Sequence, residues 1–323
     1  MGFGARWCAV FAVAVACAGA VGAVGRPRAE PMPTKPSPVV VELWPEGVPG
    51  LAPGGGPEKI VGGHVTNVSV PTLTVFAPPA GTSKGVAGIV CPGGGYMVLA
   101  VDKEASELTR WLNAIGVTVF VLKYRVATQR HPAPLRDVLR AVRLVRSRAA
   151  EWGIDPKRVG VFGSSAGGHL AASAATLFDA PEGKTGAPLD ATSARPDFVV
   201  LQYPVITMAG AATHAGSRDA LLGPKPTAEL LARVSLERQV TAATPPAFLI
   251  HTAEDKSVLA ENSMLFYQAL RAAGIPSELH LYEKGPHGFG IKPGLGPTSD
   301  WPRRAEDWMR AHGWLESQAP VVR

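Results

Sequence analysis

The sequence predicts an α/β fold built on a mostly parallel sheet with helices on both faces. Short apolar runs bounded by turn residues are typical of strands that are buried on both faces of such a sheet. Amphipathic helical patterns separate these runs, and this strand–helix alternation favours a doubly wound domain. The runs lie at residues 86–90, 118–122, 159–162, 198–201 and 247–250.

The remaining elements extend this pattern toward both ends of the chain. Residues 72–76 alternate apolar and polar side chains, which predicts an antiparallel edge strand, and residues 278–282 are expected to form the last strand. Residues 206–244 lack clean periodicity and are expected to form a partial cap or a long loop. Helices are predicted at residues 104–114, 135–152, 166–177, 260–273 and 300–312.

The first 23 residues have the composition of an export signal. Arg6 precedes an apolar stretch over residues 7–24, and small residues at 18–20 form a site of the kind that signal peptidase cleaves. A permanent membrane anchor is an alternative, although the stretch is broken by glycine and short for a span. Lipid attachment at Cys17 is another, although Ala14 stands where a lipoprotein signal usually has Leu. We expect a secreted or periplasmic protein without stable membrane insertion.

One folded domain is expected after the signal. A Pro-rich linker over residues 24–38 leads into a domain over 39–315, and a tail follows over 316–323. The chain has 323 residues, of which 46% are hydrophobic, enough for one large core. Removal of the signal would leave Cys91 as the one cysteine, so no intramolecular disulfide is expected and Cys91 is interpreted as a buried small hydrophobe.

The charge of the chain does not point to a nucleic-acid partner. Lys and Arg number 32 against 26 Asp and Glu, giving a formal net charge of +6 without a long basic run. Arginines recur at spacings of three and four in one predicted helix, which indicates a solvated helix face. They are Arg136, Arg140, Arg143 and Arg146, with Arg148 beside them. The sequence does not indicate the oligomeric state.

A serine nucleophile is predicted at Ser165. Residues 163–167 match the pattern G-x-S-x-G, which alone is a weak signal, but a predicted strand precedes them and an Ala-rich helix follows. A tight strand-to-helix turn forces the serine backbone into strain, and flanking glycines let strand and helix approach closely. The hydroxyl is then exposed at the carboxyl end of the sheet, near the positive end of the helix.

A glycine-rich segment is expected to stabilise the oxyanion that such a serine generates. Three glycines follow the strand predicted at residues 86–90, and their backbone N–H groups are free to point at a ligand. Together with the amide of Ala166, they are the predicted donors. Tyr96 is the expected substrate contact, and Tyr124 and Tyr203 are further candidates to line the pocket, although aromatic side chains near a core more often pack within it.

The predicted base and its orienting acid come later in the chain. A loop after the strand at residues 247–250 carries Asp255, and a loop bounded by Gly and Pro after the last strand carries His287. Asp255 is preferred to its neighbour Glu254 because Lys-Ser-Val follows it, the usual continuation of this loop. The other histidines are interpreted as structural, with His169 packing on the helix after the serine.

With these motifs the chain resembles the bacterial esterase/lipase branch of the α/β-hydrolases, related to the hormone-sensitive-lipase group. It is most similar to the exported acetyl-xylan-esterase-like members, over about residues 39–315. Pro92 stands where the lipase-type branch has His, which argues against a long-chain lipase. Arg125 and Asp137 recur in the pattern and are interpreted as structural. The segments that carry the resemblance are 92–96, 122–126, 131–137, 163–169, 251–258 and 282–289.

The resemblance implies the α/β-hydrolase fold and a serine carboxylic-ester hydrolase that needs no metal or cofactor. It also implies short acyl substrates, with acetyl groups on a xylan-type polysaccharide as the expected case. A serine peptidase of the prolyl-oligopeptidase type is one alternative, although those enzymes usually carry a large β-propeller and only about 40 residues precede this domain. A non-catalytic binding protein on the same fold is another, and it would be expected to lack a member of the triad. The triad that the resemblance implies is Ser165, His287 and Asp255, with Gly94, Gly95 and Ala166 as oxyanion donors.

Overall fold

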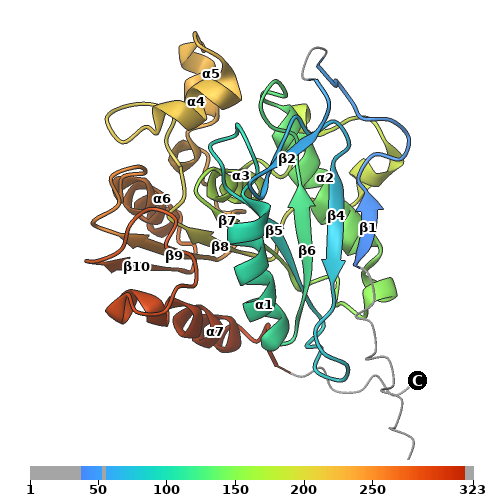
Figure 1. Ribbon diagram of the computed structural model, residues 1–323, viewed down its shortest axis with the longest axis vertical. Helices are drawn as coiled ribbons and strands as arrows, with labels where there is room; N and C mark the ends of the chain where they lie inside the picture. The colour runs from blue at the N-terminus through green and yellow to red at the C-terminus, as the bar shows by residue number, and fades with distance from the viewer. Residues whose placement is uncertain (1–37, 53–55, 317–323) are drawn as a thin grey trace, which may run out of the picture. The chain divides into compact units, whose positions relative to one another are not determined.

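An eight-stranded sheet organises the residues described by this computed structural model, which are 38–52 and 56–316 (Figure 1). The strand order is β1-β4-β6-β5-β7-β8-β9-β10. The pairings of β1 with β4 and of β4 with β6 are antiparallel, and every other pairing is parallel, as the sequence predicts. The strands are β1 (Val39–Glu42), β4 (Thr72–Phe76), β5 (Val86–Cys91), β6 (Val117–Lys123), β7 (Val159–Ser164), β8 (Phe198–Gln202), β9 (Ala247–Thr252) and β10 (Ser277–Tyr282).

The described residues belong to one of two units into which the chain divides. Residues 1–37 form the first unit and residues 38–323 the second. The expected export signal and nearly all of the expected linker therefore lie outside the described residues, as does the tail beyond residue 316. In the described part of the chain, no helix combines the length and the apolar character needed to cross a bilayer.

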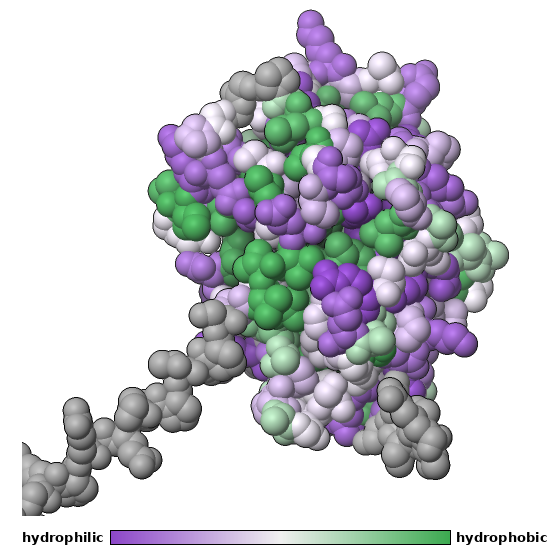
Figure 2. Space-filling view, turned by 90° about the vertical axis from the view of Figure 1, so that its right-hand side faces the viewer, coloured by the Kyte–Doolittle hydropathy of each residue, from purple (hydrophilic) through white to green (hydrophobic). Residues whose placement is uncertain are grey.

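The edge of the sheet differs from the prediction. β4 forms where an edge strand was expected, but β1 pairs with its outer side and takes the edge position. The side chains of Val39 and Val40 in β1 are 60% and 59% exposed, so this strand lacks the burial pattern by which sequence periodicity identifies strands. A separate hairpin, β2 (Lys59–Val61) with β3 (His64–Thr66), was not predicted either. Figure 2, which views the molecule from the β1 side, shows apolar patches among polar side chains.

Two hydrophobic cores lie on the two faces of the sheet. Neighbouring residues along a strand enter opposite cores: Val119 and Phe198 face one, whereas Phe120 and Val199 face the other. This arrangement is what continuous apolar runs predict for a strand that is covered on both sides. The first core is covered by α1 (Ser106–Ala114) and α7 (Trp301–Ala311), and the second by α2 (Ala133–Ser147), α3 (Ala166–Thr176) and α6 (Glu261–Ala272) (Figure 1).

The arginines of α2 do not form the solvated face that their spacing suggested. Arg140 and Arg143 are only 6% and 2% exposed, because the segment after β1 and residues 182–197 cover this helix. Their guanidinium groups donate to backbone carbonyls and pair with Glu46 and Asp190. Arginine can be buried in this way because its fork of donors satisfies several acceptors at once. The prediction of a solvated face was therefore wrong.

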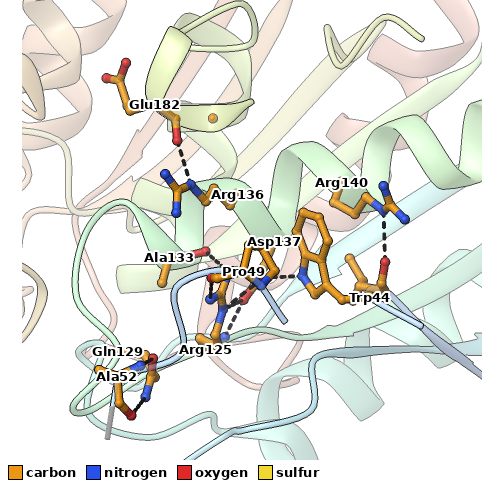
Figure 3. A network of polar contacts seen from close by, with 12 residues as sticks. Trp44, Pro49, Ala52, Arg125, Gln129, Ala133, Arg136, Asp137, Arg140 and Glu182 are labelled. Carbon is orange, nitrogen blue, oxygen red and sulfur yellow. Dashed lines mark hydrogen bonds and ion pairs between the residues drawn. The ribbon is translucent and has the colours of Figure 1, made fainter. Parts of the chain in front are cut away.

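A buried ion pair joins the end of β6 to α2 (Figure 3). Arg125 Nη2 lies 2.8 Å from Asp137 Oδ1, and neither side chain is exposed. Asp137 also accepts from Trp44 Nε1, while Arg125 donates to the carbonyl oxygen of Pro49. Removing one partner of such a pair leaves an uncompensated buried charge, at a typical cost of about 3–5 kcal/mol. The pair therefore fixes the loop after β6, in agreement with the structural role expected for both residues.

Residues 206–244 form a small cap segment rather than a loop alone. The cap segment contains two short helices, α4 (Ala215–Leu222) and α5 (Ala228–Arg233). Figure 1 shows them beyond the carboxyl ends of the parallel strands. Each helix begins at a side chain that accepts from its own first turn: His214 for α4 and Thr227 for α5.

Candidate active site

Ser165 occupies the sharp turn between β7 and α3. Its backbone has φ +55° and ψ −122°, a region that non-glycine residues rarely adopt. Two backbone hydrogen bonds hold the turn in this conformation: the Ser165 amide donates to the Gln202 carbonyl at 3.0 Å, and the Val205 amide donates to the Ser165 carbonyl at 3.0 Å. The end of β8 therefore braces the strained residue.

Glycines around Ser165 let neighbouring backbone segments pack so closely that no side chain would fit between them. A Cβ added at Gly163 would collide with the carbonyl oxygen of Gly167, and one added at Gly167 would collide with that of Cys91. At Gly168, a Cβ would lie 2.7 Å from the Cβ of Pro204. Helix α3 thus packs directly on β7 and on the end of β5, which confirms the reason given for the flanking glycines.

The imidazole of His287 bridges Ser165 and Asp255. Its Nε2 lies 2.9 Å from Ser165 Oγ, and its Nδ1 lies 2.7 Å from Asp255 Oδ2. Because an ionised carboxylate can only accept, Nδ1 carries the proton and Nε2 is left to accept from the serine hydroxyl. The ring of Tyr203 packs edge-on against the imidazole, with 5.0 Å between ring centroids. The structure thus brings together the three residues that the sequence singled out.

Asp255 is held as a carboxylate by several donors. Burial alone would raise its pKa, but hydrogen bonds from His251, His287 and the amide of Val258 lower the pKa well below the usual range. His251 is completely buried, and its Nε2 lies 3.4 Å from Asp255 Oδ2. Glu254 points elsewhere and accepts from the Gly285 amide at 3.0 Å. The structure therefore favours Asp255 over Glu254 as the partner of His287.

The glycine-rich segment after β5 lies against the serine. A Cβ added at Gly93 would lie 3.0 Å from Ser165 Cβ, and Gly94 and Gly95 have φ of +127° and +65°. The turn is closed by amides of Met97 and Val98 donating to the Gly94 carbonyl. Among the described residues, the amides of Gly94 and Gly95 donate to no protein acceptor, nor does that of Ala166 at the start of α3. These three amides are therefore available to a ligand.

Tyr96 does not lie where a substrate contact would. It is 2% exposed, and its hydroxyl lies 2.8 Å from His169 Nδ1. His169 Nε2 in turn lies 2.8 Å from the Val234 carbonyl in the cap segment, so Nε2 carries the proton and Tyr96 donates to Nδ1. Tyr124 and Tyr203 are also fully buried. The substrate-binding role expected for Tyr96 is therefore not supported, and its position instead fixes the glycine-rich segment.

Sequence reasoning missed the polar roles of two histidines. His169 was interpreted as packing, whereas it connects α3, the glycine-rich segment and the cap segment. His251 was among the histidines interpreted as structural, and its contact with Asp255 was not predicted. In the described part of the chain, no three His, Cys, Asp or Glu side chains are grouped so as to hold a metal ion. Burial raises the pKa of Cys91, which is consistent with the interpretation of this cysteine as a small hydrophobe.

The sheet topology, the strained serine at its centre and the following acid and histidine define the α/β-hydrolase fold. A family model confirms this class, because it matches residues 73–270. The chain belongs to the BD-FAE family. This match includes Ser165 and Asp255 and ends before His287.

Relatives and solved structures agree with this assignment. The chain is 34% identical over 223 residues to an acetylxylan esterase of Xylanibacter ruminicola, covering 68% of this chain and 44% of that protein. It is 41% identical over 207 residues to endo-1,4-beta-xylanase B of Butyrivibrio fibrisolvens, covering 63% of this chain and 32% of that protein. It thus spans less than half the length of these curated relatives.

Two solved structures match over most of both chains. The acetyl ester-xyloside bifunctional hydrolase from Caldicellulosiruptor lactoaceticus is 39% identical, with a TM-score of 0.77 over 88% of this chain and 100% of that one. The carboxylesterase Cest-2923 from Lactobacillus plantarum is 27% identical, with a TM-score of 0.65 over 81% of this chain and 99% of that one.

The buried His169 predicts a pH dependence of stability. Burial lowers the pKa of His169 from 6.5 to about 4, so between these pH values the unfolded chain binds a proton more readily than the folded one. Protonation of His169 therefore does not lower the free energy of unfolding above about pH 6.5. As the pH falls toward about 4, the free energy of unfolding decreases by up to ~3 kcal/mol. Denaturant unfolding across this interval should give a shallower decline for His169→Gln than for wild type. The exposed His64 supplies the control His64→Gln, and equal slopes for all three proteins would contradict the assignment.

Proposed function

We propose that this protein is a serine carboxylic-ester hydrolase in which Ser165, His287 and Asp255 form the catalytic triad. The observation that carries the proposal is the position of one imidazole between the other two groups, 2.9 Å from Ser165 Oγ and 2.7 Å from Asp255 Oδ2. A hydrogen-bonded nucleophile and base, with the base oriented by a buried carboxylate, is the arrangement that activates a serine. Membership of a family with esterase relatives supports the same reaction class.

The reaction follows from these contacts. Ser165 Oγ attacks the ester carbonyl while His287 Nε2 takes its proton, and Asp255 stabilises the resulting imidazolium. His287 then returns the proton to the leaving alcohol, which leaves an acyl group on Ser165. His287 then takes a proton from a water molecule as that water attacks the acyl-enzyme. It returns the proton to Ser165 Oγ, which releases the acid and restores the serine.

Negative charge that develops on the carbonyl oxygen is met by the amides of Gly94, Gly95 and Ala166. Support for this role comes from their freedom from protein acceptors and from the contact of the glycine-rich segment with Ser165. The Ala166 amide also lies at the positive end of α3, which adds a fixed dipole aimed at the same point. Loss of one such donor typically lowers kcat by about 10²–10³-fold.

The substrate class that we propose is a short acyl ester, with acetyl groups on xylan-type polysaccharide as the main case. The names of the acetylxylan esterase and the acetyl ester-xyloside hydrolase support this choice. Pro92 before the glycines distinguishes the chain from lipase-type relatives, as the sequence indicated. No structural observation favours the peptidase or the binding-protein alternative.

Ser165→Ala tests the triad. We expect kcat on p-nitrophenyl acetate to fall on the order of a millionfold, because the nucleophile is removed while the fold is kept. Ser164→Ala is the matched control, since this neighbouring buried hydroxyl donates to Gln202 and makes no contact with His287. Reaction with a fluorophosphonate should label wild type and the control and spare Ser165→Ala. Retention of most activity in Ser165→Ala would remove the basis of the proposal.

A substrate panel tests the acyl and alcohol preference. Purified protein should hydrolyse acetyl esters faster than butyryl or octanoyl esters and should release acetate from acetylated xylan. A peptide anilide, which a prolyl-oligopeptidase-type enzyme would cleave, should not react measurably. Faster turnover of the anilide than of the acetyl ester would replace the esterase proposal with the peptidase alternative.

We also retain export as part of the proposal, on the composition of residues 1–23. Expression of the full chain in a bacterial host should place the activity in the periplasm or the medium, with a shortened N-terminus by mass spectrometry. Replacement of residues 1–23 by a single Met should leave the activity in the cytoplasm. Cytoplasmic, unprocessed full-length protein would contradict the export signal.

A further inference from the structure

The helix that precedes β6 in the chain carries two carboxylates that reach separate parts of the proposed active site. It begins as a π-helix, η1 (Val101–Ala105), and continues as α1. Glu104 and Glu107 lie three residues apart across this junction, which places both on the same side of the helix. π-Helical turns are frequent at functional sites.

Glu104 holds the glycine-rich segment. Its Oε2 accepts from the Gly93 amide at 2.6 Å, and the Ala100 amide donates to the Gly93 carbonyl at 2.9 Å. Gly93 also has no room for a side chain, because an added Cβ would lie 2.7 Å from Glu104 Oε2 and 3.0 Å from Ser165 Cβ. The Glu104 side chain is buried, so the bond to Gly93 is shielded from water. Gly94 and Gly95 follow directly on this clamped residue.

Glu107 holds the histidine loop. Its Oε2 accepts from the Ile291 amide at 3.1 Å, four residues after His287. A Cβ added at Gly290, where φ is +55°, would lie 2.6 Å from the same oxygen, so the carboxylate packs directly on the backbone. From the other side, Trp301 Nε1 donates to the Gly290 carbonyl at 2.8 Å. The loop after His287 is thus anchored at the Gly290 carbonyl and at the Ile291 amide.

One buried tyrosine is affected by the charge of both carboxylates. Tyr203 is fully buried, and it packs against His287 and Phe289 with ring centroids 5.0 and 4.7 Å apart. Burial, followed by the charge of Glu104, raises the pKa of Tyr203, and the charge of Glu107 acts in the same direction. The charges of both carboxylates therefore act on the tyrosine that packs against the imidazole.

We propose that Glu104 and Glu107 are paired positioning residues of the esterase reaction. Glu104 fixes the oxyanion donors through Gly93, and Glu107 fixes the base through the loop after His287. One rigid helix start thereby sets the distance between the two halves of the site. This inference rests on the proposed function, since it assigns these residues to the machinery of that reaction. Neither side chain touches the reacting atoms.

The two residues should differ in their response to the leaving group. Glu104→Leu removes the acceptor for Gly93 and should lower kcat/KM for ethyl acetate and p-nitrophenyl acetate by a similar factor, about 10–100-fold, because both reactions need the oxyanion donors. Glu107→Leu should lower kcat/KM for ethyl acetate about tenfold more than for p-nitrophenyl acetate. Ethoxide must be protonated by His287 as it leaves, whereas p-nitrophenoxide leaves without a proton.

Glutamine variants show whether the hydrogen bond of each glutamate, rather than its charge or its packing, is what the reaction needs. Glu104→Gln and Glu107→Gln keep the chain length and one acceptor oxygen, so each should restore kcat/KM to within about threefold of wild type. Asp102→Leu is the matched control, because it removes an exposed carboxylate from the same helix start and should leave kcat/KM within about twofold. Glu104→Ala replaces Glu104→Leu if the latter does not accumulate as folded protein.

Thermal unfolding and fluorophosphonate titration give the amount of folded, reactive enzyme to which each rate is normalised. Wild-type kcat/KM in the Leu variants would overturn the inference, as would equal losses in the Gln and Leu variants. A loss in Glu107→Leu that is the same for both esters would overturn the role assigned to that residue. Failure of the proposed function is seen separately, in an inactive wild type or an active Ser165→Ala.

Discussion

The constraint on which the site depends is the close approach of backbones at the turn from β7 to α3. Ser165 can hold its strained conformation because Gly163 and Gly167 let the helix lie directly on the strand. The same contact brings Gly167 against the carbonyl of Cys91 at the end of β5. The start of the glycine-rich segment is therefore positioned by the same packing as Ser165, the proposed nucleophile, and the two cannot shift independently.

Hydrogen bonds from buried side chains also hold the glycine-rich segment in place. The glycine-rich segment is held at Pro92 by Tyr124, at Gly93 by Glu104 and at Tyr96 by His169. These three supports come from the residue after β6, from the η1 turn and from α3, so the segment is fixed from separate parts of the fold. A charge-assisted bond of the Glu104 type typically contributes about 1.5–3 kcal/mol. The strength of this bracing suits donors that must be in place before charge develops.

Local patterns predicted the parts of the molecule in which burial is regular. The central parallel strands and the order of serine, acid and histidine could be identified because apolar runs and glycine-bounded motifs are local signals. β1 was missed because an exposed four-residue edge strand has no periodic burial. The solvated face predicted for the arginines of α2 was wrong, and the contact of Tyr96 with His169 was not predicted, because their partners lie in distant segments such as residues 43–46. Glu104 and Glu107 look in sequence like ordinary acidic residues in the first turn of a helix.

The cap segment explains why substrate preference is the property that sequence patterns leave most open. Its α4 begins at His214, and the buried Ser217 lies with Oγ 3.9 Å from a Cβ built on Gly95. The same segment supplies the Val234 carbonyl that fixes His169 and, through it, Tyr96. The cap segment, which lacks clean periodicity, thus lies beside Gly95 and also holds Tyr96 in place through His169. The proposed triad residues belong to other elements, so changes in the cap segment can leave them in place. Proteins that share one fold can in this way differ in the substrate they accept.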